Sequence, residues 1–182
     1  FTGYIRGINL GGWLSQCDHR KEHYDTFITE NDINKISSWG LDHVRLPIDY
    51  ELVQTEHGDF IEDGFAYIDN CLNWCEKYGL NMILDLHKAR GYYCDEFETS
   101  DFFHSSKLQE DFINLWVEFS KRYGKYYDRL SFELLNEVVD RNVAPLWNGI
   151  IGRTIKEIRK YVPSIHILVG GVESNSILTL EM

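Results

Sequence analysis

Asn136 and Glu137 are the residues of this chain whose type and position point most directly to chemistry. They end the run Leu130 to Glu137, in which apolar residues at consecutive positions indicate a strand buried on both faces. A buried carboxyl is costly unless it is paired, and enzymes with parallel sheets place their active sites where the strands end. We therefore interpret Glu137 as a catalytic group that transfers a proton. In the alternative interpretation, Asn136 and Glu137 only cap the loop after the strand.

Earlier apolar runs also carry polar residues at or near their ends, namely Asn9, Arg45, Asp85 and His87. Because side chains alternate along a strand, Asp85 and His87 lie on one face of theirs. The same alternation places Glu133 on the face of Glu137, deeper in the sheet. We interpret Asp85 and Glu133 as supports for the site rather than as catalysts.

Arg45 keeps its positive charge and stands among apolar residues, so it needs an anionic partner. An ordinary internal ion pair with Glu133 would satisfy it. His87 could donate a hydrogen bond to a ligand, or it could be a hydrogen-bonded histidine of the core. Four aromatic residues in the expected loops after strands could provide flat rings for stacking on a sugar: Trp13, Tyr92, Tyr93 and Trp147.

Alternating strands and helices are expected to position these residues. The apolar runs predict strands at Tyr4 to Leu10, His43 to Ile48, Asn81 to His87, Leu130 to Glu137 and His166 to Gly170. Amphipathic segments between them predict helices at 30–39, 63–78, 106–123 and 145–161. The helix ends are marked by residues that cap or break helices: Thr29 with Asp32, Gly40, Gly79, Gly124, Pro145 and Pro163.

The fold class follows from strands whose two faces are both apolar, which indicates a parallel sheet flanked by helices. A doubly wound sheet would usually carry a glycine-rich phosphate loop after its first strand, and no such spacing follows Gly7, Gly11 and Gly12. We therefore predict an α/β fold of the (β/α)8 TIM-barrel type. About the first five βα units are present, so the barrel is incomplete. Residues 1–182 would be the N-terminal portion of a single catalytic domain.

Composition narrows the class of partner. The formal net charge of -11 argues against nucleic acid and against an anionic membrane surface, because both attract basic patches. Five Trp and eleven Tyr residues fit a protein that binds a neutral sugar. No cofactor is expected. The first residues lack the profile of a signal peptide, so the compartment, secreted or cytoplasmic, stays open.

The four cysteines do not form a disulfide scaffold. Cys71 and Cys75 follow the core-facing spacing of a helix and are expected to be buried thiols. Cys17 and Cys94 fall in expected loops at one end of the fold. They could pair, and the sequence alone does not decide it.

Four motifs resemble glycoside hydrolase family 5, and they occur in that family's order, each on its expected strand. They are Gly7-Ile8-Asn9-Leu10-Gly11-Gly12-Trp13, Val44-Arg45-Leu46-Pro47, Leu84-Asp85-Leu86-His87 and Leu135-Asn136-Glu137. Further stretches resemble the bacterial endoglucanase branch of the family: Phe27-Ile28-Thr29-Glu30, Tyr67-Ile68-Asp69 and Gly170-Gly171 with Asn175-Ser176. The resemblance therefore covers nearly all of the chain.

This resemblance implies a retaining hydrolase of β-1,4-glucan, an endoglucanase or cellulase, with an oligo- or polysaccharide as substrate. Retention needs one carboxylic acid to protonate the leaving oxygen and a second carboxylate to attack the sugar. Glu137 would be the acid, Asn136 would bind the hydroxyl beside the anomeric carbon, and Arg45 would keep the nucleophile ionised. His87 would bind another hydroxyl. The substrate-binding residues would be Asn9, Trp13, Tyr92, Tyr93 and Trp147.

Two departures from the family pattern bear on activity. Related endoglucanases commonly carry a second histidine and a proline after the residue that matches His87, whereas this chain has Lys88-Ala89-Arg90. These two cations could change the linkage preference, favour a charged glycan or face solvent. The family's nucleophilic glutamate has no counterpart before Met182, so the 182-residue chain alone is expected to be inactive.

Other functions remain as alternatives. Mannanases, β-1,3-glucanases and xyloglucanases of similar architecture use the same pair of carboxylates. A metal hydrolase could draw ligands from His19, His23, His87 and Cys94, but the segment around His19 and His23 is polar throughout, so a solvated loop without metal is expected. A non-catalytic half barrel could instead self-associate through its open edges.

Overall fold

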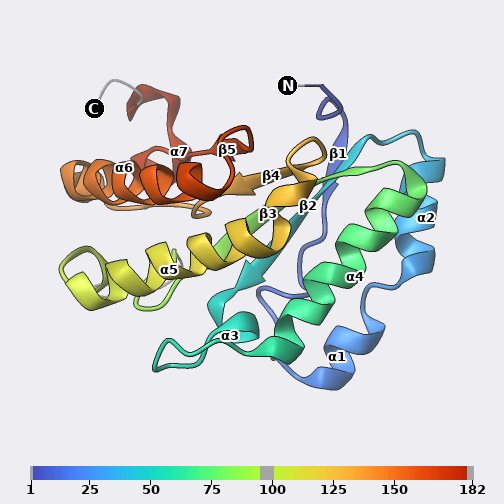
Figure 1. The fold of residues 1–182 in the computed structure, drawn as a ribbon, viewed down its shortest axis with the longest axis horizontal. Coiled ribbons are helices and arrows are strands. Elements are labelled where there is room, and N and C mark those ends of the chain that lie inside the picture. Colours follow the sequence, from blue (N-terminus) through green and yellow to red (C-terminus); the bar gives the residue numbers. More distant parts are fainter. Residues whose placement is uncertain (1, 95–100, 180–182) are drawn as a thin grey trace. The chain divides into compact units, whose positions relative to one another are not determined.

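The computed structural model describes residues 2–94 and 101–179. Five strands form one sheet in the order β1-β2-β3-β4-β5 (Figure 1). The strands are β1 (Gly7–Asn9), β2 (His43–Asp49), β3 (Asn81–Lys88), β4 (Leu130–Glu133) and β5 (His166–Leu168). β1 pairs with β2, and β4 with β5, in the parallel direction. Strand order thus follows chain order, as expected when each strand is followed by a helix that returns the chain to the next position.

Helices connect the strands. The four predicted helices are confirmed to within one residue at each end: α2 (Glu30–Ser38), α4 (Glu62–Tyr78), α5 (Ser106–Tyr123) and α6 (Ala144–Tyr161). Among the described residues, three short α-helices were not predicted: α1 (Lys21–Thr26), α3 (Tyr50–Val53) and α7 (Val172–Asn175). Every helix in the described residues is too short or too polar to cross a bilayer.

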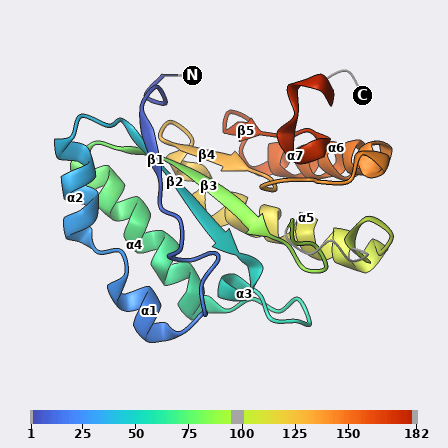
Figure 2. The ribbon, with the colours of Figure 1, turned by 180° about the vertical axis from the view of Figure 1, so that it is seen from behind.

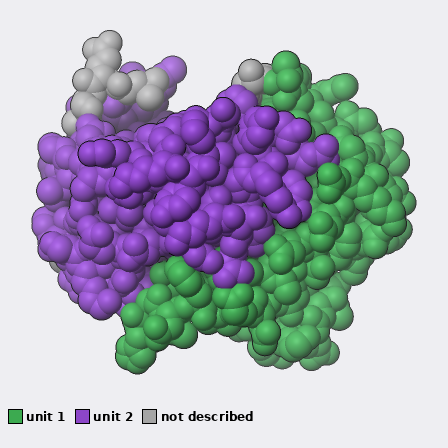
Figure 3. Space-filling view, in the orientation of Figure 1, with its two compact units in different colours: residues 1–85 green, residues 86–182 purple. Residues whose placement is uncertain are grey.

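Contacts divide the chain into two compact units, unit 1 at residues 1–85 and unit 2 at residues 86–182 (Figure 3). The boundary falls inside β3. The expectation of a single domain over residues 1–182 stays a prediction, and the two units are described in turn.

In unit 1, α2 and α4 cover one face of the strands (Figure 1), and Figure 2 presents these strands from the opposite side. Ile33 of α2, Ile68 and Leu72 of α4 and Leu46 of β2 are at most 2% exposed and form part of the core. Ile68 and Leu72 are four residues apart, so they share one face of α4. Cys71 and Cys75 are fully buried on this helix, as predicted, and all four cysteines of the chain carry free thiols.

The ends of the unit 1 helices confirm the predicted caps. Gly79 closes α4 with a φ of 70°, a left-handed conformation that is strained for residues with a Cβ. At the start of α2, the Asp32 carboxylate accepts hydrogen bonds from the backbone N–H of Thr29 at 3.0 Å and from its hydroxyl at 2.7 Å. These hydrogen bonds hold the pKa of Asp32 below its usual range.

Replacing Asp32 with alanine should lower the free energy of unfolding by about 1 kcal/mol, because the first turn of α2 loses its cap. Urea denaturation of both proteins measures the difference. Asp69→Ala, which removes an exposed carboxylate within α4, is the matched control and should leave stability nearly unchanged. Equal losses in the two variants would show that the Asp32 hydrogen bonds do not stabilise α2.

In unit 2, Trp116 connects α5 to β4. Its ring centroid lies 5.0 Å from that of Phe132 in β4, and its indole N–H donates a hydrogen bond to the carbonyl of Leu134 at 3.1 Å. Trp116 and Phe132 are fully buried. Because Phe132 points toward α5, the alternation of side chains directs Glu133 to the opposite face of the sheet.

Candidate active site

The polar residues of unit 1 form a connected group on three neighbouring strands. Asn9 of β1 stands opposite Arg45 of β2 in the parallel register. Arg45 donates from Nη1 to Oδ1 of Asn9 at 3.0 Å, and its Nη2 lies 2.8 Å from Oδ2 of Asp85 in β3. Asp85 is fully buried, whereas the Arg45 side chain is 22% exposed. Asp85 is therefore an anionic partner of Arg45, whereas the sequence analysis had named Glu133 or the expected nucleophile for that role.

In unit 2, Asn136 and Glu137 follow β4 rather than end it. The strand was expected to reach Glu137 but stops at Glu133. The backbone beyond it still makes sheet-like hydrogen bonds: the N–H of Leu134 donates to the carbonyl of Leu168, and the N–H of Asn136 to that of Leu86. The apolar run therefore predicted burial correctly, but strand pairing ends earlier. Alternation within the strand consequently does not fix the direction of the Glu137 side chain.

The loop at Glu137 is held by a buried tyrosine. Tyr92 donates its hydroxyl hydrogen to the carbonyl of Glu137 at 2.8 Å and accepts a hydrogen bond from the N–H of Val139 at 2.9 Å. Burial raises the pKa of Tyr92 to about 12, so it remains a protonated phenol that can donate at neutral pH. Sequence reasoning missed this role, because a tyrosine 45 residues earlier carries no local sign of its partner.

The same loop is also held from the segment after β5. The side-chain amide of Asn175 donates to the carbonyl of Asn136 at 2.9 Å, and the N–H of Ser174 donates to the carbonyl of Val138 at 3.1 Å. Asn136 is 8% exposed, and its side-chain amide lies 3.7 Å from Sγ of Cys94. The backbone of Glu137 is thus fixed on both sides.

The Glu137 side chain is partly exposed, and within residues 2–94 and 101–179 its carboxyl has no hydrogen-bond or ion-pair partner. A carboxyl on a rigid backbone with free oxygen atoms can donate or accept a proton at a fixed point.

Three of the aromatic residues expected to stack on a sugar lie in the core instead. Trp13 is 1% exposed and stacks on Trp74 with ring centroids 6.1 Å apart. Trp147 is 1% exposed and donates its indole N–H to the carbonyl of Gly170. Tyr92 is 8% exposed. Buried rings do not offer the open face that stacking requires, so these positions contribute to packing.

The remaining predicted site residues of unit 2 are His87, in β3, and Tyr93, in the loop after it. His87 is 8% exposed. Lys88 places its ammonium 5.5 Å from the ring centroid of Tyr93, which is half-buried. Arg90 pairs with Asp111 of α5. Both cations that depart from the family pattern therefore have partners within unit 2.

His19 and His23, two of the residues considered as metal ligands, contact different partners. Nε2 of His23, in α1, lies 2.7 Å from the carbonyl of Gly12, and the ring of His23 stacks on Phe27. His19 lies instead beside Asp49 and Glu51, a grouping that the sequence did not predict. The polar segment at His19 and His23 was expected to be a loop, and its second half forms α1.

Comparison with known proteins decides the family. The model of the cellulase family, glycosyl hydrolase family 5, matches residues 6–181. The chain belongs to this family. Cellodextrinase A of Ruminococcus flavefaciens is 48% identical over 180 residues, which are 98% of this chain and 54% of that protein. Endoglucanase C of Acetivibrio thermocellus is 45% identical over 178 residues, 96% of this chain and 52% of that protein.

The fold of this cellulase-family chain also matches that of a solved family structure. Endoglucanase Cel5A of Thermotoga maritima matches with a TM-score of 0.80 and 26% identity, covering 97% of this chain and 54% of Cel5A. The chain therefore spans about half the length of the relatives it matches. The predicted fold class, an incomplete barrel of the (β/α)8 type, is confirmed.

Proposed function

We propose that the full-length protein containing this chain is a retaining glycoside hydrolase that cleaves β-1,4-glucan, with Glu137 as its general acid and base. The observation that carries the proposal is the carboxyl of Glu137, which has no partner among the described residues and belongs to a loop fixed by Tyr92 and Asn175. Relatives named cellodextrinase and endoglucanase support the substrate class. The nucleophilic carboxylate would come from a residue outside these 182.

The chemistry has two steps. Glu137 gives its proton to the glycosidic oxygen while the second carboxylate attacks the anomeric carbon, so the C–O bond breaks and a glycosyl ester forms. Glu137, now a carboxylate, then takes a proton from the water that attacks the same carbon. Two inversions restore the β configuration.

The other residues would bind and orient the sugar. Asn136 would hydrogen-bond the hydroxyl beside the anomeric carbon, where the contact strengthens in the transition state. His87 would donate to another hydroxyl, and Asn9 and Tyr93 would contact the substrate. Arg45, which Asp85 holds in place, would keep the nucleophile ionised.

Hydrolysis of cellopentaose by the full-length protein, followed by proton NMR, should show the β-anomer of the new reducing end first. The α-anomer should grow only as the product mutarotates. Initial formation of the α-anomer would show inversion and refute the assignment of a covalent intermediate. Parallel assays on laminarin and mannan would identify a β-1,3-glucanase or mannanase, the alternatives on this fold.

The 182-residue chain by itself should release no sugar from carboxymethylcellulose, because it lacks the proposed nucleophile. Measurable turnover by this chain would place both carboxylates within it. Light scattering of the same sample would test self-association, since a dimer is the expected state of a half barrel that pairs through its open edges.

A further inference from the structure

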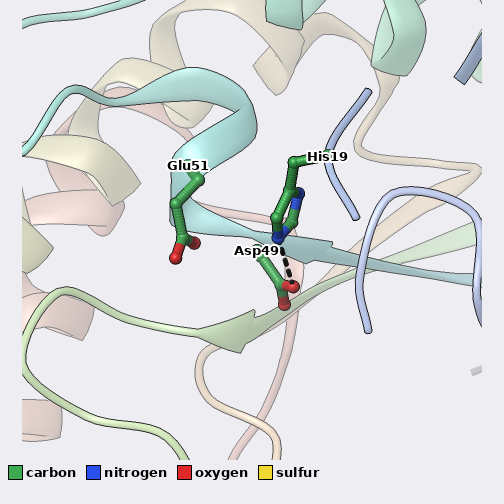
Figure 4. Close-up of side chains that lie close together, drawn as sticks. All are labelled: His19, Asp49 and Glu51. Carbon is green, nitrogen blue, oxygen red and sulfur yellow. Dashed lines mark ion pairs between the residues drawn. The ribbon is translucent and has the colours of Figure 1, made fainter. Parts of the chain in front are cut away.

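Three side chains of unit 1 that the proposed hydrolysis does not use converge beside the end of β2. Asp49 is the last residue of β2, Glu51 lies in α3, and His19 belongs to the loop before α1. One ligand atom from each lies within 4.8 Å of the other two. Figure 4 shows the His19 ring above the Asp49 carboxyl, with the Glu51 carboxyl to one side.

Asp49 is so deeply buried that the cost of removing its charge from water must be offset by nearby polar or charged groups. Its side chain is 4% exposed. Oδ2 accepts a hydrogen bond from the N–H of Gln16 at 3.0 Å and lies 3.3 Å from Nε2 of His19. The side chain of Ser15 also contributes a hydrogen bond to this carboxylate. Oδ1 is nevertheless buried and makes no hydrogen bond of standard length and angle among the described residues. A buried carboxylate oxygen without a well-formed hydrogen bond is costly and points to a group that completes the site.

The imidazole of His19 is oriented as a ligand would be. Its Nδ1 lies 2.7 Å from the hydroxyl of Tyr24. When Nδ1 carries the hydrogen and donates it to Tyr24, the lone pair of Nε2 faces Asp49. Histidines that bind metals usually donate their other N–H in this way, which fixes the ring and the tautomer.

The spacing of His19 and Asp49 fits one shared ion. Two ligand atoms, each roughly 2 Å from a tetrahedral ion, are separated by roughly 3.3 Å, and Nε2 of His19 and Oδ2 of Asp49 are 3.3 Å apart. Glu51 is partly exposed in the short helix α3, so its carboxylate can approach by rotation of the side chain. The His19 side chain is 28% exposed, which leaves a path for the ion and for water.

We propose that His19, Asp49 and Glu51 bind one divalent transition-metal cation, with Zn²⁺ as the best match. One imidazole nitrogen and two carboxylate oxygens suit Zn²⁺ better than Mg²⁺ or Ca²⁺, which prefer oxygen ligands alone. Two carboxylates and a neutral imidazole carry two negative charges, which the ion neutralises. Bound there, the ion connects the loop before α1 to the end of β2 and stabilises unit 1.

Equilibrium dialysis of the full-length protein against Zn²⁺, with metal analysis, should give one bound ion that His19→Ala and Asp49→Asn remove. In competition with a fluorescent zinc chelator, each variant should bind Zn²⁺ at least about tenfold more weakly. Replacing a residue that only hydrogen-bonds a metal ligand already weakens metal binding by about that factor. Zn²⁺ should also raise the Tm of the wild type and not that of His19→Ala.

His57→Ala and Asp59→Asn are the matched controls, because both remove an exposed side chain of the same type from unit 1. They should bind Zn²⁺ as the wild type does. If Asp49→Asn does not fold, as judged by circular dichroism, Glu51→Gln replaces it, since Glu51 is less buried. Wild-type affinity in His19→Ala, or equal losses in the controls, would overturn the site. Neither result depends on hydrolytic activity, so the proposed function is tested separately.

Discussion

Glu137→Gln in the full-length protein should lower kcat on cellooligosaccharides by about 100- to 10,000-fold, because the leaving oxygen loses its proton donor. The amide has nearly the same shape, and Tyr92 contacts the backbone of Glu137 rather than its side chain, so the fold should persist. An aryl cellobioside with a highly acidic phenol needs no protonation, so the glycosyl ester should still form. The second step should then be slow, because water lacks its base.

Azide tests this assignment further, since it attacks the glycosyl ester without needing a base. Added azide should restore turnover of the aryl cellobioside by Glu137→Gln and yield a β-glycosyl azide. Glu110→Gln removes an exposed carboxylate of α5 in the same unit and should leave kcat unchanged. A uniform loss on all substrates without rescue would assign Glu137 a structural role.

The helices were predictable because their signals are local. Thr29 with Asp32 and Gly79 fix helix ends within a few residues of chain, and the structure places those ends where these residues indicate. The end of β4 was not predictable to the same degree. Apolar residues continue to Leu135, but whether strand pairing continues beyond Glu133 depends on the neighbouring strands, which the run itself does not encode.

The residues of the candidate site could be selected from the sequence, and their roles stay predictions, whereas their contacts could not be predicted. Glu137 was selected because it follows a buried strand. The partner Asp85 of Arg45, the tyrosine that holds the Glu137 loop and the approach of His19 to Asp49 all depend on pairing between distant segments. Trp13 and Trp147 were expected to be exposed but are buried. The sequence alone does not distinguish an exposed ring after a strand from a ring that packs in the core.

Arg45→Met should destabilise the chain by about 3 kcal/mol, because it leaves the fully buried carboxylate of Asp85 without the guanidinium 2.8 Å away. Breaking a buried pair costs about 3–5 kcal/mol, and the partial exposure of Arg45 places this pair near the lower end. Combining Arg45→Met with Asp85→Leu should restore much of the loss, because the double variant leaves neither charge behind. Urea denaturation of the wild type, both single variants and the double variant measures the coupling.

The exposed ion pair between Arg153 and Glu110 is the matched control, and breaking it should change stability by less than about 1 kcal/mol. If the effects of Arg45→Met and Asp85→Leu simply add, to within about 0.5 kcal/mol, the pair is not coupled and Asp85 does not hold Arg45. A large coupling would instead mean that the position of Arg45 is set before any substrate binds. In that case Asp85→Asn should also lower kcat in the full-length enzyme, because the proposed role of Arg45 requires the guanidinium at a fixed place.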